Sequence, residues 1–411
     1  MVDFHGGGLN GMDGERGLTG GQSRRWREGG RCQWMALAVL AVLGLLVWLA
    51  TPADMDRHGG RSGFSGAKQP KGQAAPVQGH TSYSRYQRLL DDSYSMVQNC
   101  TEIDDVLQKY YLSPSYGIEF CIGFPGNLLV VLGYIFCLPK WQSCNIYLFN
   151  LAVSDLIFLC TLPRLSYLYA NDQSETNPFA CVINRYILHV NLYSSILFMV
   201  WLSMDRFLLI RHPTRNHYLL RPRTALIVTG LSWLAVNVEV APMIALMVHD
   251  LQGTNWSLCN DFASLEGEIN NFGYSLGLTF TGYILPLLGL CGFSHQIAHL
   301  LRVQERALQR RTSFKRPLRV VASAAAMFLF LYTPYHVLRN VSIASMQRWA
   351  GLPLCTKMYI KGLYILTRPV AFLHSVINPV FYFLMGDKFR ELVFAKLRTL
   401  VRKTEQQSTP A

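Results

Sequence analysis

Seven long stretches of almost uniformly apolar residues follow one another along most of the chain, separated by short polar connections. Each stretch has about 20 residues or more, which lets a helix cross a hydrocarbon layer about 30 Å thick. All of them contain proline or glycine, which membrane helices tolerate because neighbouring helices satisfy the freed backbone groups. The pattern predicts an all-α membrane protein, a seven-transmembrane helix bundle, with spans at 116–138, 146–170, 178–211, 223–248, 270–302, 316–344 and 357–384.

The polar connections alternate in charge, and the alternation predicts how the bundle lies in the membrane. Basic residues gather in every second connection, whereas the others carry mainly acidic residues. Because basic connections stay in the cytoplasm, the end near residue 110 is expected outside the cell and the C-terminus inside. We therefore expect a multi-pass protein of the plasma membrane, with its bundle at 111–385. The segment 386–411 is expected to be a cytoplasmic tail that starts with an amphipathic helix on the inner lipid leaflet.

The segment before the bundle, 1–110, differs in composition from the rest. It is rich in glycine, serine and arginine and has little periodicity. Such a segment is expected to be disordered, and by the topology above it is extracellular. One apolar run, 34–50, follows several arginines and precedes small residues. It fits a late-starting signal peptide, a short membrane anchor or an over-extended reading of the gene, and the sequence does not decide among the three.

Composition excludes two broad classes of function. Only 15% of the residues are charged and 50% are apolar. Soluble domains carry about 25% charged residues, so a soluble enzyme is not expected. The net charge of +13 does not indicate a nucleic-acid binder, because the basic residues lie between apolar spans rather than on one folded domain. They face the anionic lipid of the inner leaflet instead.

Four of the ten cysteines fall on the side assigned as extracellular, where disulfides persist. We expect the pairs Cys181–Cys259 and Cys100–Cys355, and the alternative is that these outer cysteines are free. Asn99 begins an Asn-Cys-Thr acceptor for glycosylation on the same side. A second acceptor, Asn-Trp-Ser, begins at Asn255.

Each of the seven spans carries its own short motif. The third span ends in Asp205-Arg206-Phe207, and the seventh in Asn378-Pro379-Val380-Phe381-Tyr382. Gly126-Asn127, Leu151 to Asp155, Trp233, Pro286 and Pro334 occupy the first, second, fourth, fifth and sixth spans. In this order the motifs resemble the rhodopsin-like G-protein-coupled receptors over residues 110–400. The resemblance implies coupling to a heterotrimeric G protein.

Two polar sites within the bundle follow from that resemblance. Arg206 is expected to pair with Asp205 in a resting state and to meet the G protein when released. Asp155 is a carboxylate in mid-membrane, which is costly and therefore a functional candidate. As the family implies, it could hold a sodium ion together with Asn191 and Ser195, and the alternative is a protonated Asp155.

Three positions depart from the family pattern near these sites. Ser294 stands where a tyrosine is usual, Tyr332 where a tryptophan is usual, and His374 where an asparagine is common. The departures put the efficiency of activation in question, but not the fold.

The expected outer third of the bundle is unusually cationic. Arg185 and His189 are four residues apart and share a helix face. Arg339 and Arg368 lie near the outer ends of the sixth and seventh spans. A single arginine at such a place often extends to the lipid headgroups, but three on facing helices favour an anionic ligand, which Arg grips bidentately.

Within the family, Asn184 to His189, Cys259 to Ser264 and Thr333 to Asn340 are similar to the receptors for succinate. That similarity implies a small dicarboxylate as ligand. The residues expected to bind it are Arg185, His189, Arg339 and Arg368, with Tyr116, Tyr169 and Tyr364 lining the pocket and Asp261 screening or gating the charge. Ser342 stands where that branch has a further arginine, and Arg164 is a possible substitute.

Other functions stay open on the sequence alone. The ligand could be 2-oxoglutarate or a nucleotide, or the chain could be a receptor-like protein that does not signal. A dicarboxylate transporter is disfavoured because no inverted repeat or pair of broken helices is visible. No cofactor is expected.

Overall fold

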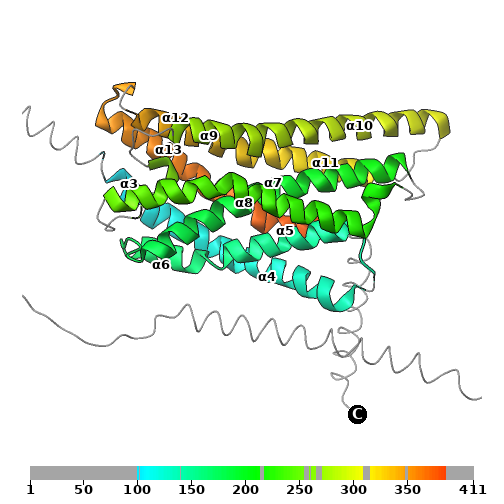
Figure 1. Ribbon diagram of the computed structural model, residues 1–411, viewed down its shortest axis with the longest axis horizontal. Helices are drawn as coiled ribbons and strands as arrows, with labels where there is room; N and C mark the ends of the chain where they lie inside the picture. Colours follow the sequence, from blue (N-terminus) through cyan, green and yellow to red (C-terminus); the bar gives the residue numbers. More distant parts are fainter. Residues whose placement is uncertain are drawn as a thin grey trace, which may run out of the picture.

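The computed structural model describes residues 100, 102–138, 140–212, 217–253, 259, 261–264, 271–308, 315–347 and 350–385. The apolar run 34–50, the acceptors Asn99 and Asn255 and the tail 386–411 lie outside these residues. In the described part every regular element is a helix. The long helices run side by side along one direction, and α3, α6, α12 and α13 gather at one end of the bundle (Figure 1).

The helices have the following bounds: α3 Ile103–Leu107, η1 Gln108–Leu112, α4 Ser113–Cys137, α5 Ser143–Leu159, α6 Leu162–Ala170, α7 Pro178–Arg211, η2 Tyr218–Leu220, α8 Pro222–Gly253, η3 Phe262–Ser264, α9 Asn271–Thr279, η4 Phe280–Ile284, α10 Leu285–Leu308, α11 Lys315–Met327, η5 Phe328–Tyr332, α12 Thr333–Met346, α13 Leu354–Phe372 and α14 His374–Met385. Three short π-helical turns, η1, η4 and η5, join consecutive α-helices without breaking the rod. Such turns insert a residue into a helix and often mark functional places.

Among the described residues, six helical rods are long and apolar enough to cross a membrane: Ile103–Phe136, Ser143–Ala170, Pro178–Arg211, Pro222–Gly253, Asn271–Val303 and Val321–Met346. The second to sixth agree with the predicted spans to within about five residues. The first rod begins at Ile103, earlier than the predicted span at 116 and inside the segment expected to be disordered. The reason is that α3 and η1 extend α4 towards the end of the bundle where α13 begins.

Packing within the bundle leaves a lipid-compatible exterior. α7 lies at its centre and contacts α5, α8 and α10, while α14 packs on α4 and α5. On α8, the side chains of Leu231, Leu234 and Val238 are each about 60% exposed. Apolar residues in such positions face hydrocarbon, because water would make their exposure costly.

One close approach fixes how η4 sits on α7. A Cβ added at Gly282 would lie 2.4 Å from a ring carbon of Tyr193, closer than any real side chain tolerates. Glycine therefore lets the fifth rod press directly on the Tyr193 ring. The hydroxyl of that ring is one of the groups around the candidate site.

Candidate ligand-binding site

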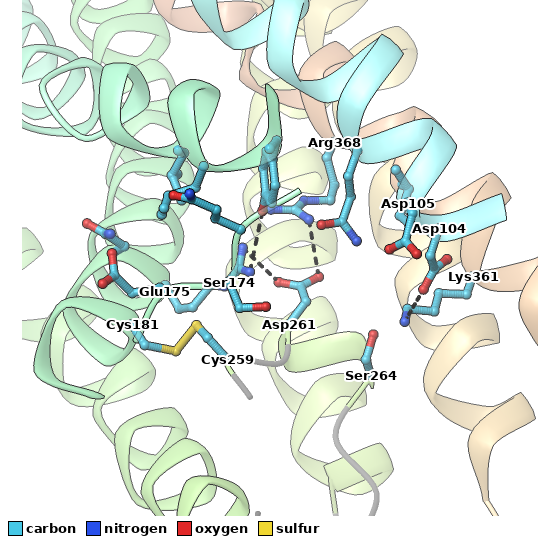
Figure 2. A pocket seen from close by; sticks show the side chains of 18 of the residues that line it. Asp104, Asp105, Ser174, Glu175, Cys181, Cys259, Asp261, Ser264, Lys361 and Arg368 are labelled. Carbon is cyan, nitrogen blue, oxygen red and sulfur yellow. Dashed lines mark hydrogen bonds and ion pairs between the residues drawn. A yellow bond between two sulfur atoms is a disulfide. The ribbon is translucent and has the colours of Figure 1, made fainter. Parts of the chain in front are cut away.

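A cavity of about 240 Å³ lies at the end of the bundle that carries the Cys181–Cys259 disulfide. Its walls come from α3, α6, α7, α13 and the segment that follows Cys259 (Figure 2). Both expected disulfides are present, with Cα atoms 5.9 Å apart in Cys181–Cys259 and 5.3 Å apart in Cys100–Cys355. The charged residues that line the cavity are Asp104, Asp105, Glu175, Arg185, Asp261, Lys361 and Arg368.

The carboxylate of Asp261 is held between two arginines. Its Oδ1 lies 3.5 Å from Nη1 of Arg185, and its Oδ2 lies 3.9 Å from Nη1 of Arg368. The hydroxyl of Tyr364 donates to Oδ2 at 2.7 Å. Figure 2 shows this carboxylate turned towards Arg368, with a dashed line between the two. Asp261 thus binds as a carboxylate ligand would, but it belongs to the chain.

These contacts keep Asp261 ionised. Burial on its own would raise the pKa of the carboxyl, but Arg368 and Arg185, and then the Tyr364 hydroxyl, outweigh burial and hold that pKa well below its usual range. Opposite charges that are taken out of water together stabilise each other only when their geometry is good. The Asp261 carboxylate is therefore an internal counter-ion of the two arginines.

The two guanidinium groups retain hydrogen-bonding capacity. The side chains of Arg185 and Arg368 are only 7% and 4% exposed. Arg185 Nη2 donates to the Tyr169 hydroxyl at 3.5 Å, while Nη1 of Arg185 and Nη2 of Arg368 have no hydrogen-bond acceptor among the described residues. Buried guanidinium nitrogens without acceptors are costly, and an added anion would satisfy them.

Arg339 does not lie with the other two arginines. Its guanidinium donates to the Tyr193 hydroxyl, to the side chain and carbonyl of Ser275 and to the Thr279 hydroxyl, and it lies 5.7 Å from the centre of the Tyr335 ring. The side chain is fully buried between α7, α9 and α12 and does not line the cavity. Arg185 and Arg368 thus meet at the same carboxylate, whereas Arg339 lies outside the cavity lining, and its part in ligand binding stays a prediction.

Two other expected ligand residues lie deeper than the cavity wall. His189 is fully buried, with Nδ1 2.8 Å from the Arg185 carbonyl and Nε2 3.5 Å from the Tyr335 hydroxyl. Tyr116 is fully buried, and its ring centre lies 6.2 Å from that of Tyr169. Of the expected set, Arg185, Arg368, Tyr169, Tyr364 and Asp261 line the cavity itself.

The short helix α3 forms a wall that the sequence did not indicate. It carries Asp104 and Asp105 into the cavity, and Asp104 forms a salt bridge with Lys361 on α13. Two further contacts fix α3 there. The Cys100–Cys355 disulfide joins it to the start of α13, and a Cβ at Gly362 would lie within 3.3 Å of both Ile103 and Leu107.

Arg164, a possible extra cation, is already engaged. Its Nε and Nη2 donate to the two carboxylate oxygens of Glu175 at 2.6 and 2.7 Å. These bonds from Arg164 lower the pKa of Glu175, against the opposing effect of burial. The Arg164 side chain is 58% exposed, so the bidentate pair lies at the edge of the cavity.

At the opposite end of the bundle, Arg206 and Asp205 form the expected ion pair, with Nη2 and Oδ2 3.2 Å apart. Asp205 also accepts a hydrogen bond from Ser143 at the start of α5. Pro379 lies on α14 against Gly126 of α4, and Asn378 of α14 is buried. Tyr382 belongs to α14, and its side chain lies outside the described part.

The chain matches the family described as "7 transmembrane receptor (rhodopsin family)" across residues 126–382, and it belongs to that family. It is therefore a multi-pass plasma-membrane receptor rather than an enzyme. Membership of this family implies that a small-molecule ligand binds and that the receptor couples to a G protein.

The chain is similar to Succinate receptor 1 of Mus musculus, with 43% identity over 302 residues that cover 73% of this chain and 94% of the mouse protein. Succinate receptor 1 of Rattus norvegicus is 44% identical over the same length and with the same coverage. A purinoceptor of Homo sapiens is more distant, with 29% identity over 300 residues, 72% of this chain and 80% of the human protein.

Proposed function

We propose that this chain is a receptor that binds extracellular succinate, or a closely related small dicarboxylate, and activates a heterotrimeric G protein. The observation that carries the proposal is the carboxylate of Asp261 between Arg185 and Arg368. This pair of arginines accepts a carboxylate, and the hydroxyls of Tyr364 and Tyr169 lie beside it. The names of the mouse and rat relatives agree with this ligand class.

A dicarboxylate would act by replacing Asp261. One carboxylate of the ligand takes the place between Nη1 of Arg185 and Nη1 of Arg368, and the second uses Nη2 of Arg368, which has no acceptor among the described residues. Each charge-assisted hydrogen bond contributes roughly 1.5–3 kcal/mol, and releasing Asp261 and immobilising the ligand offset much of this. The balance suits binding in the micromolar to millimolar range, about −4 to −8 kcal/mol.

The size of the cavity separates the candidate ligands. Its volume is about 240 Å³. Drug-sized ligands occupy roughly 300 Å³ or more. A four-carbon dicarboxylate fits such a space better than a nucleotide, although purinoceptors are among the relatives. 2-Oxoglutarate is longer than succinate by one carbon and is the nearer competitor.

The membrane topology belongs to the same proposal. Together α13 and α14 form the seventh span, the cavity faces the outside of the cell, and the N-terminal segment is extracellular with glycans at Asn99 and Asn255. The Asp205–Arg206 pair, Asn378, Pro379 and Tyr382 then lie on the cytoplasmic side, where they control access of the G protein.

Substitution of the two cavity arginines tests the ligand assignment. Cells that express Arg185→Ala or Arg368→Ala should lose the response to succinate while the protein still reaches the surface. Arg164→Ala is the matched control, because Arg164 is an exposed arginine at the edge of the cavity that pairs with Glu175. A full response from either cavity variant would refute the proposal.

A dose series separates the remaining alternatives. Succinate, malate, 2-oxoglutarate and adenine nucleotides are applied to cells with and without the chain. We expect succinate to act at the lowest concentration. A stronger response to a nucleotide would favour the alternative ligand, and succinate binding without a G-protein response would identify a receptor that does not signal.

A further inference from the structure

Asp155 lies at the centre of the bundle and is surrounded by hydrogen-bond donors. Its Oδ1 accepts from Asn191 at 3.0 Å and from Ser375 at 2.8 Å, with the Ser195 hydroxyl at 3.5 Å. Its Oδ2 accepts from Asn378 at 2.7 Å. None of its surface is exposed. A carboxylate so deep within a membrane helix requires a positive charge beside it or a proton of its own.

The resemblance to rhodopsin-like receptors implies a sodium ion for that charge, but the residues present do not fit one. Sodium is a hard cation that takes oxygen ligands. Asn191 and Asn378 turn their amide nitrogens to the carboxylate, so their oxygens face away from it. Ser375 presents its hydroxyl hydrogen to the same carboxylate. The neighbours thus offer hydrogens where a cation would need lone pairs.

His374 can supply the positive charge that the neighbouring asparagines and serine lack. Its side chain is fully buried, and its Nε2 lies 3.7 Å from Oδ1 of Asp155, within ion-pair range. Its Nδ1 lies 2.7 Å from the carbonyl oxygen of Ala371. A carbonyl oxygen can only accept a hydrogen bond, so Nδ1 must carry a hydrogen. A neutral ring with that tautomer would then turn the lone pair of Nε2 towards a carboxylate oxygen, which is repulsive.

The remaining surroundings of His374 are neutral. Tyr332 of η5 stacks edge-on at 5.4 Å between ring centres, and Phe372 of α13 lies at 6.3 Å. Within the described residues Asp155 is the charged group that faces the imidazole, and Tyr332 is the other titratable one. This repulsion is relieved only if one additional proton is present. The proton can be on Nε2 of His374 or on the carboxyl group of Asp155.

We propose that Asp155 and His374 hold one proton between them, and that this built-in charge takes the place of a mobile monovalent cation in the bundle. The site is then neutral as a whole. Sodium gains nothing by entering it, so the receptor neither needs sodium nor is regulated by it at this place. His374 is the residue that excludes the ion.

Thermal unfolding of the purified full chain in detergent tests the inference without relying on signalling. Melting temperatures are compared in sodium chloride and in choline chloride at equal ionic strength and fixed pH. The natural chain should melt at the same temperature in both salts. A higher melting temperature in sodium chloride would overturn the proposal.

His374→Asn removes the charge and offers an amide oxygen. We expect its melting temperature to be about 2–4 °C higher in sodium than in choline, because a bound ion stabilises the folded state. The double variant Asp155→Asn, His374→Asn should lose this difference again, which places the ion at Asp155. His374→Gln is a second variant in case His374→Asn does not fold. A folded variant that ignores sodium would refute the role given to His374.

Discussion

The guanidinium of Arg339 on α12 donates to the hydroxyl of Tyr193 on α7 at 2.6 Å, and this bond joins two helices in the middle of the bundle. The same arginine reaches Ser275 and Thr279 on α9. Gly282 lets the fifth rod press on the Tyr193 ring, so three rods meet at one phenol. Arg339 therefore stabilises the junction of these rods in the state described here, rather than lining the ligand cavity.

Tyr193→Phe should loosen that junction. The substitution removes one acceptor from a buried charged donor, so we expect a loss of roughly 1–3 kcal/mol in stability. Melting temperature of the purified chain without ligand measures it. Tyr167→Phe is the control, because the Tyr167 side chain is 46% exposed and removal of its hydroxyl should change little. Equal melting temperatures for the two variants would contradict the stabilising role of this bond.

Asp261→Asn should lower stability and strengthen the effect of ligand. The variant leaves two buried guanidinium groups without their counter-ion, a loss of about 3–5 kcal/mol when one partner of a buried pair is removed. Succinate no longer has to displace a carboxylate, so the rise in melting temperature on adding it should exceed that of the natural chain. Asp172→Asn, which removes an exposed loop carboxylate paired with Lys109, is the control. If succinate raised both melting temperatures equally, Asp261 would not compete with the ligand.

The contribution of Asp261 to stability should not change across the physiological pH range. Its pKa is held well below the usual range, mainly by Arg368 and Arg185 against the effect of burial. A lowered carboxyl pKa stabilises the fold above the unfolded value of about 3.9, and the benefit is lost as the pH falls below that. The difference in melting temperature between the natural chain and Asp261→Asn should therefore be constant from about pH 7.5 to 5 and shrink only below about pH 4. A difference that already shrinks between neutral and mildly acidic pH would contradict this pairing.

Asp105→Asn should increase the potency of anionic ligands. Asp105 is an exposed carboxylate on the cavity wall, and none of the ion pairs between described residues involves it. Removing one exposed charge is worth roughly 0.2–1 kcal/mol, which corresponds to an increase of up to about fivefold. The gain should be larger for a tricarboxylate such as citrate than for succinate, and smaller at high salt. Glu102→Gln changes the charge three residues earlier and away from the cavity lining, so it should have little effect.

Much of the bundle could be predicted because the hydropathy of the sequence directly indicates where the membrane-spanning helices lie. The third predicted span coincides with α7, whose start is marked by Pro178 and by an Asn177 side chain that accepts from the first turn. The side of the membrane identified the four cysteines that form the disulfides, but four cysteines allow three pairings, and the side alone does not choose among them. Asp261 lies two residues after Cys259, so the disulfide alone places it near the outer end of α7.

The position of Arg339 could not be predicted in the same way. It lies on a helix with polar groups on more than one face, and hydropathy does not determine how such a helix is rotated about its axis. The wall formed by α3 was missed for another reason. Residues 103–110 are charged and short of apolar periodicity, and their helix forms because α13, the disulfide and the first turn of α4 support it.

The Cys100–Cys355 disulfide joins residues 255 positions apart, so it closes nearly the whole described bundle into a covalent ring. Its two ends are Cys100, three residues before the wall helix α3, and Cys355 at the start of α13, the helix that carries Arg368. These helices cannot separate when a ligand displaces Asp261. The disulfide therefore keeps these two walls of the cavity joined covalently whether or not a ligand is bound.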